Sequence, residues 1–165
     1  MHYQHYKSPI GSLTLAGDEQ ALHALLLPGD NIQRLWPEAT SADAPFIQVR
    51  QQLDEYFAGN RRHFDLPLAL SGTAFQLQVW HALQRLDYGQ TCSYQQLALA
   101  IDNPRAVRAV GRANGANPIA IIVPCHRVIG HGGALTGYAG GIERKQWLLR
   151  HEGVRLDSGQ VELAL

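Results

Sequence analysis

Hydrophobic and polar residues follow a pattern typical of β-strands along the first 27 residues of the chain. Strands are predicted over residues 2–7, 12–17 and 20–27, with turn-forming residues between them. In the second segment the letters SLTLA alternate apolar with polar residues, which predicts a strand with one buried face. The chain therefore begins with a small sheet.

A connecting loop is expected over residues 28–44, because this segment is rich in turn formers. An amphipathic helix follows it. Asp43 is placed to cap that helix, Pro45 suits its first turn, and Gly59 lies just past its end. A further short strand is predicted over 62–66. The first half thus indicates a small α/β unit, and no group of residues in it suggests a chemical site.

Helical patterns dominate the second half. The segments TAFQ at 73–76 and SYQQ at 93–96 are capping boxes, which predict helices running to about residues 86 and 101. Asn103 and Pro104 predict the cap and first position of the next helix. This helix and the one that ends near residue 101 form a helix-turn-helix candidate. A last helix is predicted over 142–151.

The change in pattern predicts two domains, residues 1–72 and residues 73–165. The fold class is α/β (α+β), with a sheet-plus-helix domain followed by a mostly helical one.

Three arginines are expected on one face of the second helix of the helix-turn-helix candidate. At 100° per residue, Arg105, Arg108 and Arg112 fall on one side, and Val110 points the opposite way. Ala109 lies beside the arginines, and its small side chain leaves room for a partner to approach this face of the helix closely. A solvated arginine face is the ordinary explanation of such a pattern, but its position within a helix-turn-helix favours contact with phosphates or a DNA groove.

Chemistry is concentrated in IAIIVPCHRVIG, residues 119–130. The apolar run 119–123 predicts a buried strand, which Pro124 ends, so that Cys125 emerges at the strand end beside His126. A thiol reacts as the thiolate, and its ordinary pKa of about 8.5 has to be lowered or its proton taken by a base. His126 is the candidate base. Because neighbouring residues of a strand face opposite ways, this pairing requires an irregular backbone or a bridging water.

Glu152 is a candidate for the third group of such a site. It follows the predicted helix 142–151, where the helix dipole disfavours a carboxylate, and local violations of this kind often mark function. On these residues alone an inert buried cysteine and a cysteine hydrolase with a Cys-His-Glu triad both stay open. A metal site is disfavoured, because Cys92 and Cys125 are far apart in sequence and form no C-x-x-C pair.

Composition narrows the class of protein only slightly. The chain has 165 residues and a formal net charge of zero, with a net charge of −3 over residues 1–71 and +3 over 72–165. This contrast hints that the second half faces an anion. The N-terminus has no apolar segment of signal-peptide length, and no segment approaches the length of a membrane span. We therefore expect a soluble, cytoplasmic protein with reduced thiols.

The segment IVPCHRVIG, the helix-turn-helix with Arg108, and LTGYAGGIERKQWLLRHEG resemble the O6-alkylguanine-DNA alkyltransferase family, also called methylated-DNA–protein-cysteine methyltransferases. The resemblance is strongest over residues 73–153 and is closest to the bacterial constitutive type. It implies a winged-helix-like DNA-binding domain that enters the minor groove. It also implies a DNA repair protein that flips the damaged nucleotide out of the duplex and consumes itself in one alkyl transfer.

The resemblance assigns roles to individual residues. Cys125 would accept the alkyl group, His126 would take its proton through a water, Glu152 would orient His126, and Asn117 would hold the active-site turn. A second set would contact the substrate or DNA: Tyr94 as a donor to the leaving guanine, Arg108 as the finger that fills the vacated space, Ala109 and Arg112 beside it, and Val128, Tyr138, Ala139 and Gly140 as the wall of the base pocket.

The implied partner is double-stranded DNA that contains O6-alkylguanine, with O4-alkylthymine as a further substrate, and the implied state is a monomer without a cofactor. No cysteine precedes Cys92, so the metal that some members carry in their first domain is not expected. Small residues at Ala120 and Ala139 suggest a pocket open to bulkier alkyl groups. A lesion-binding protein that does not repair is the alternative within the same superfamily, and the presence of Cys125 argues against it.

Overall fold

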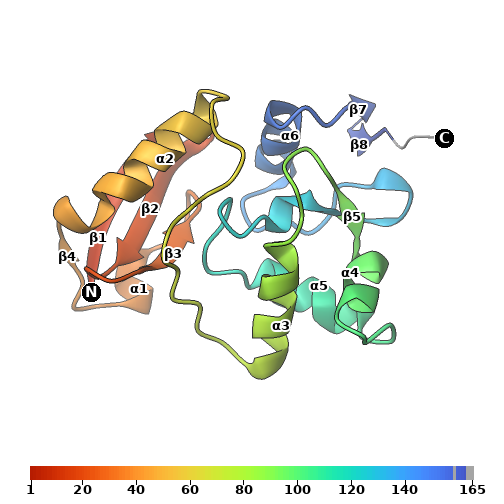
Figure 1. The fold of residues 1–165 in the computed structure, drawn as a ribbon, viewed down its shortest axis with the longest axis horizontal. Helices are drawn as coiled ribbons and strands as arrows, with labels where there is room; N and C mark the ends of the chain where they lie inside the picture. The colour runs from red at the N-terminus through yellow and green to blue at the C-terminus, as the bar shows by residue number, and fades with distance from the viewer. Residues whose placement is uncertain (158, 163–165) are drawn as a thin grey trace. The chain divides into compact units, whose positions relative to one another are not determined.

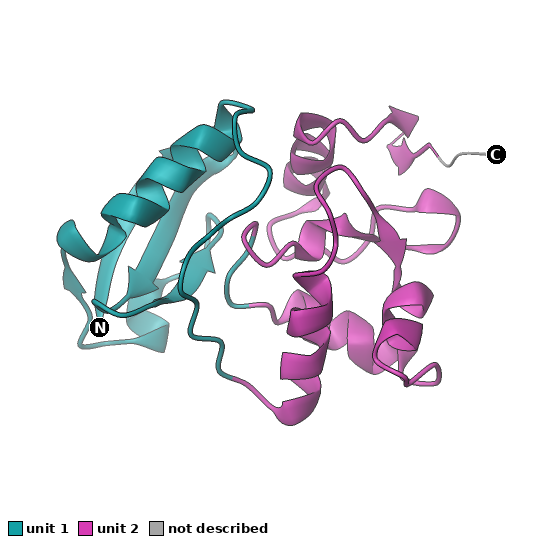
Figure 2. Cartoon of the chain, viewed as in Figure 1, with its two compact units in different colours: residues 1–71, 118–120 teal, residues 72–117, 121–165 magenta. Residues whose placement is uncertain are grey.

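The computed structural model describes residues 1–157 and 159–162 and divides the chain into two compact units. The first unit consists of residues 1–71 and 118–120, and the second of residues 72–117 and 121–165 (Figure 2). Pro118, Ile119 and Ala120 therefore belong to the first unit, although they lie in the sequence between a helix and the reactive turn of the second. No helix in the described ranges is long and apolar enough to cross a membrane.

The first unit is built on a four-stranded sheet in the order β3-β2-β1-β4 (Figure 1). Its strands are β1 (His2–Ser8), β2 (Gly11–Gly17), β3 (Leu22–Leu26) and β4 (Thr40–Ser41). The first three pair antiparallel, whereas β4 pairs parallel with β1. The three long strands confirm the sequence prediction, but β2 is buried on both faces, since Thr14 is covered as well as Leu13 and Leu15.

Helix α2 (Ile47–Phe57) covers one face of this sheet (Figure 1). Its buried side chains include Val49, Leu53 and Tyr56, spaced at helical intervals as predicted. The short 3₁₀ helix η1 (Ala44–Phe46) precedes α2, and Asp43 makes no side-chain capping bond to it. The expected cap is therefore wrong, and the entry into the helix is set instead by the 3₁₀ turn.

Two other segments of the first unit differ from the sequence prediction. The expected loop 28–44 contains a one-turn helix, α1 (Ile32–Leu35), whose N-cap Asn31 accepts a hydrogen bond from the Gln33 N–H, and it also contains β4. The strand predicted over 62–66 is absent, and only Leu68 bridges to Leu22. The side-chain amide of Gln52 holds the backbone of Asp65 in the place of a strand ladder.

The second unit carries helices α3 (Ala74–Leu83), α4 (Tyr94–Ala100), α5 (Val107–Gly115) and α6 (Ile142–His151). Both predicted capping boxes are formed, with Thr73 and Gln76 at α3 and with Ser93 and Gln96 at α4. The indole of Trp80 donates to the Ala113 carbonyl over 2.8 Å and ties α3 to α5. Helices α4 and α5 also pack on each other and form the helix-turn-helix.

Helix α5 begins later than predicted. Asn103 and Pro104 lie in a turn, and the N-cap residue is Ala106, so Arg105 is outside the helix. Asp102 adopts a left-handed conformation (φ 56°), which makes the sharp break after α4. The expected arginine face is therefore carried on the helix by Arg108 and Arg112 alone.

Short elements complete the second unit. They are β5 (Cys92–Ser93), which pairs parallel with β6 (Val128–Ile129), the 3₁₀ helices η2 (Cys125–Arg127) and η3 (His131–Gly133), and a C-terminal hairpin of β7 (Leu156–Asp157) and β8 (Gln160–Val161). Ile129, Leu149 and Val161 form a buried cluster that joins β6, α6 and β8.

The predicted strand over 119–123 is wrong, although its burial is right. Only Ile119 bridges to a strand, at Leu25, and the chain then turns, with Ile121 in a left-handed conformation (φ 72°). A β-branched residue at positive φ is unusual and is held here by close packing on all sides, since residues 119–123 are buried. Cys125 consequently follows a tight turn.

Candidate active site

Cys125 is the first residue of η2, directly after the buried turn, and is 7% exposed. Its own N–H donates to the Val123 carbonyl over 2.8 Å. Two asparagines hold the same turn. Asn117, just after α5, donates from Nδ2 to the Val123 carbonyl (2.7 Å), and Asn114, in the last turn of α5, donates from Nδ2 to the Cys125 carbonyl (3.4 Å). The backbone that carries the thiol is thus held in place by the side-chain amides of Asn114 and Asn117.

His126 and Glu152 form a buried pair beside Cys125. The ring Nε2 lies 2.7 Å from Glu152 Oε2, and neither side chain is exposed to solvent. A carboxylate can only accept a hydrogen bond, so Nε2 carries the proton and Nδ1 presents its lone pair. Nδ1 has no hydrogen-bond partner among the described residues. Burial lowers the pKa of His126, although Glu152 raises it, and the ring is therefore neutral and able to accept a proton.

Arg127 completes this arrangement and explains the unusual position of Glu152. Its Nε and Nη2 donate to the two carboxylate oxygens over 2.8 and 3.1 Å, and its Nη1 donates to the Leu86 carbonyl over 2.7 Å. Burial raises the pKa of Glu152, but His126 and Arg127 together lower it by more, so the pKa lies below its ordinary value and the carboxylate stays ionised. The turn at Gly89 lies against this carboxylate, because the Gly89 N–H donates to Glu152 Oε1 over 3.4 Å.

Burial raises the pKa of the Cys125 thiol. A hydrogen bond from the Asn117 side chain and the charge of Lys145 lower it, but burial dominates. The resting protein therefore holds a neutral thiol at Cys125 and a neutral imidazole at His126. Such a pair reacts when the imidazole takes the proton as the nucleophile attacks.

The residues expected to contact the base lie on two elements near Cys125. Tyr94 opens α4, and its hydroxyl donates to the Thr136 carbonyl over 3.3 Å, which links α4 to the loop before α6. Tyr138 from that loop is buried, and its hydroxyl has no partner within the described part of the chain. The charge of Cys125 acts on the pKa of both tyrosines, so both lie within electrostatic reach of the thiol.

The remaining members of the expected pocket wall differ in exposure. Val128 and Gly140 are buried, whereas Ala139 is exposed. On α5, Arg108 and Arg112 are exposed and Ala109 is half-buried, while Val110 on the opposite side is fully buried.

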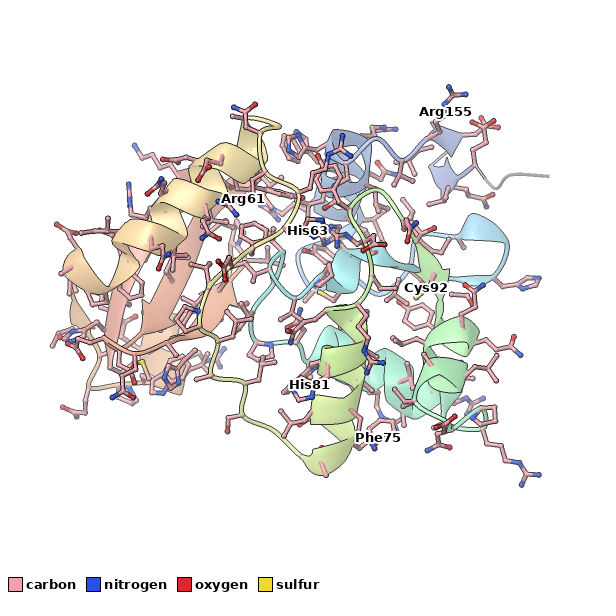
Figure 3. The ribbon with its side chains drawn as sticks, viewed as in Figure 1. Arg61, His63, Phe75, His81, Cys92 and Arg155 are labelled. Atoms are coloured by element: carbon pink, nitrogen blue, oxygen red, sulfur yellow. The ribbon has the colours of Figure 1, made fainter. Side chains whose placement is uncertain are left out.

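Within residues 1–157 and 159–162, no group of three or more His, Cys, Asp or Glu side chains is arranged to hold a metal ion. Cys92, on β5 (Figure 3), is a free thiol whose pKa burial raises to about 11.

Three residues of the site were missed from the sequence: Asn114, Arg127 and Lys145. Lys145 is fully buried on α6, and a signal for it exists in the sequence. Lys145 and Glu152 stand at positions i and i+7 of the stripe that contains Leu148 and Leu149 at i+3 and i+4. Two charged residues in an otherwise apolar stripe indicate buried charges with a function.

Comparison with known proteins identifies both units of the chain. Residues 74–154 match a family model described as 6-O-methylguanine DNA methyltransferase, DNA binding domain. Residues 1–70 match a second one, 6-O-methylguanine DNA methyltransferase, ribonuclease-like domain. Together they span most of the sequence.

Similar proteins agree with these matches. A methylated-DNA–protein-cysteine methyltransferase of Methanosarcina acetivorans is 47% identical over 154 residues, which cover 93% of this chain and 99% of that protein. The Mycobacterium tuberculosis protein of the same name is 50% identical over 152 residues, 92% of each chain.

A crystal structure of Mycobacterium tuberculosis OGT in complex with DNA aligns with a TM-score of 0.87 at 50% identity and covers 92% of each chain. At 23% identity, an O6-methylguanine-DNA methyltransferase from Pyrococcus kodakaraensis shares the fold with a TM-score of 0.60. The chain therefore belongs, as its sequence motifs predicted, to the 6-O-methylguanine-DNA methyltransferase family.

Proposed function

We propose that this protein repairs DNA by transferring the alkyl group of O6-alkylguanine irreversibly to Cys125. The observation that carries the proposal is the buried His126–Glu152 pair directly after Cys125 in the chain, in which Nδ1 of a neutral imidazole has no hydrogen-bond partner among the described residues. The family to which the chain belongs supports the same chemistry.

The proton and the alkyl group move in opposite directions. The thiol proton passes to His126 Nδ1 through one bridging water, and Glu152 stabilises the imidazolium that forms. Sulfur then forms a bond to the alkyl carbon, and the bond from that carbon to guanine O6 breaks. The electron pair of that bond leaves with the guanine, which takes a proton or a hydrogen bond from Tyr94. Because a thioether is a poor leaving group, the protein acts once.

The alkyl carbon is reached only after the nucleotide has left the base stack, which costs a few kcal/mol. Arg108 projects from α5 at an exposed position and would occupy the vacated space. Arg112 and the low surface at Ala109 bring the helix close to the DNA backbone. The wall of the pocket would be Val128, Tyr138, Ala139 and Gly140, and Asn117 would keep the reactive turn in place.

We propose O6-alkylguanine in duplex DNA as the main substrate and O4-alkylthymine as a second one. All groups of the proposed chemistry come from one chain, which supports action as a monomer. The basic second half supports an affinity for DNA that falls steeply with salt.

The proposal is tested with Cys125→Ala and with Cys92→Ser as the matched control, on a duplex that carries one O6-methylguanine with a labelled methyl group. Cys125→Ala is expected to bind the duplex without taking up label, and Cys92→Ser is expected to take up one equivalent. Label on Cys125→Ala protein, or sustained release of labelled product by the wild type, would contradict the proposal.

A further inference from the structure

The loop that joins α3 to β5 runs past the end of α6 (Figure 1). Within it, the turn of residues 86–89 binds both members of the buried Arg127–Glu152 ion pair. The Leu86 carbonyl accepts from Arg127 Nη1 over 2.7 Å, and the Gly89 N–H donates to Glu152 Oε1 over 3.4 Å. Because only 6% of Arg127 and 4% of Glu152 are exposed, groups of the protein have to satisfy these charges in the place of bulk water.

Tyr88 lies between these two contacts in the turn and touches the same ion pair with its side chain. The guanidinium carbon of Arg127 lies 5.9 Å from the centroid of the Tyr88 ring, which is within the range of a cation–π contact. The ring is half-buried, whereas the arginine that it contacts is buried. Tyr88 is therefore part of the cover that separates the Arg127 guanidinium from solvent.

The hydroxyl of Tyr88 holds the backbone from which Glu152 projects. It donates to the carbonyl of His151, the last residue of α6, over 3.2 Å. The last carbonyls of a helix lack partners within the helix, and the tyrosine supplies one here. Glu152 follows as the C-cap of α6, and its N–H donates to the Leu148 carbonyl over 3.0 Å. The turn and the end of the helix are thus tied together on both sides of the carboxylate.

Gly89 shows how closely the turn fits against this helix end. Its φ is +78°, a left-handed conformation that glycine adopts without strain. A Cβ added at this position would come within 2.9 Å of the Glu152 carbonyl oxygen. The turn therefore has no room to shift toward α6, and Tyr88 is presented to Arg127 from a fixed backbone.

The contacts of the turn reach the base through the carboxylate. Arg127 Nε donates to Glu152 Oε1 over 2.8 Å, and Arg127 Nη2 donates to Oε2 over 3.1 Å. A carboxylate held at both oxygens presents Oε2 to His126 Nε2 in one orientation, at 2.7 Å. That hydrogen bond keeps the proton on Nε2 and leaves Nδ1 as the acceptor. Any loosening of Arg127 therefore loosens the hydrogen bond that fixes the tautomer of His126.

We propose that Tyr88 is a positioning residue of the alkyl transfer, which holds Arg127 with its ring and the end of α6 with its hydroxyl, and so keeps Glu152 aligned on His126. The inference rests on the proposed function. Tyr88 takes part in no bond change, because the thiol proton goes to His126 and the alkyl group goes to Cys125.

The test compares Tyr88→Leu, which removes the ring and the hydroxyl, with Tyr88→Phe, which removes the hydroxyl alone. Tyr3→Leu is the matched control, because Tyr3 is a half-buried tyrosine of β1 in the first unit. The first readout is the exchange of the His126 Nε2–H proton with solvent, measured by NMR on ¹⁵N-histidine protein without DNA. The second is single-turnover transfer from O6-methylguanine duplex, measured against pH.

We expect the Nε2–H proton to exchange about tenfold faster in Tyr88→Leu, which loses a cation–π contact and a hydrogen bond, and about threefold faster in Tyr88→Phe. Transfer by Tyr88→Leu should slow about tenfold, because the base is held less well. Tyr3→Leu should match the wild type in both readouts.

The pH profile separates a positioning role from lost packing. Burial lowers the pKa of His126, Glu152 raises it, and Arg127 and Lys145 lower it. Loosening Arg127 removes a cation from the ring and admits water, and both changes raise this pKa. Since the base has to be neutral to accept the thiol proton, the acid limb of the Tyr88→Leu profile should move to higher pH.

A Tyr88→Leu protein with wild-type exchange of the Nε2–H proton and an unmoved acid limb would overturn the proposal, even if its transfer were slower. If Tyr88→Leu failed to fold, Tyr88→Phe would decide, because it removes one oxygen atom from a half-buried ring; exchange equal to the wild type would then overturn the proposal. The exchange measurement uses no DNA, so a failure of the wild type to transfer the methyl group would be seen separately.

Discussion

Replacing Glu152 with glutamine tests the buried network that supports the nucleophile. The carboxylate accepts hydrogen bonds from His126 Nε2, from Arg127 Nε and Nη2, and from the Gly89 N–H. A glutamine amide offers one acceptor oxygen, and its NH₂ group would face the guanidinium donors. At least two charge-assisted bonds are lost, each worth about 1.5–3 kcal/mol. The free energy of unfolding should fall by about 3–5 kcal/mol, as when a buried ion pair loses one partner.

The effect on chemistry is separate from the effect on stability. Without the carboxylate the imidazolium formed at His126 loses its stabilising charge, and the rate of alkyl transfer should fall by about 10²–10⁴-fold. Chemical denaturation measures the first effect. Rapid-quench transfer from O6-methylguanine duplex measures the second, at a temperature where the variant stays folded.

Glu143→Gln is the matched control, because Glu143 is an exposed carboxylate on the same helix. The control should keep wild-type stability and rate. If Glu152→Gln transferred the methyl group within about threefold of the wild-type rate, less than the smallest loss expected from general base catalysis, the assigned role of Glu152 would be wrong.

Two further predictions concern DNA and pH. Arg108→Ala should slow transfer from duplex DNA about tenfold, equivalent to about 1.4 kcal/mol, and leave transfer from single-stranded DNA unchanged. The control is Arg155→Ala, because Arg155 lies beside β7 and away from α5 (Figure 3). An equal loss of rate on single-stranded DNA would refute the finger role of Arg108. The free energy of unfolding should fall as the pH drops below about 6.5, because His126 takes up a proton in the unfolded chain there while burial holds its pKa lower in the folded protein. It should fall further below about pH 4.3, because Glu152 protonates in the unfolded chain there while its pKa in the folded protein is depressed. Stability independent of pH between 7 and 5 in urea denaturation would contradict the assigned ionisation of His126.

Local signals in the sequence predicted most of the helices. The boxes at Thr73 and Ser93 satisfy backbone N–H groups within four residues, so they act whatever surrounds them. The start of α5 was predicted three residues too early, because Asn103 and Pro104 have the same residue preferences in a turn as in a helix cap. Such differences depend on how the turn packs, which a local pattern does not record.

The turn before Cys125 shows what the sequence could not supply. A run of β-branched residues predicts a strand, but tertiary packing holds Ile121 at positive φ and leaves Ile119 as a single bridge. The pairing of His126 with Glu152 was expected from the family resemblance and from a carboxylate at a helix end. The role of Arg127 was not predicted, because only the folded chain brings its guanidinium group to the Glu152 carboxylate.

Mass measurement of the intact protein after incubation with excess O6-methylguanine duplex tests the central claim most directly. The account predicts a gain of one methyl group in exchange for one hydrogen per protein molecule, located by peptide mapping on Cys125, and no further reaction with added substrate. An unmodified Cys125, a methyl group on Cys92, or continued conversion of substrate after one equivalent would contradict it.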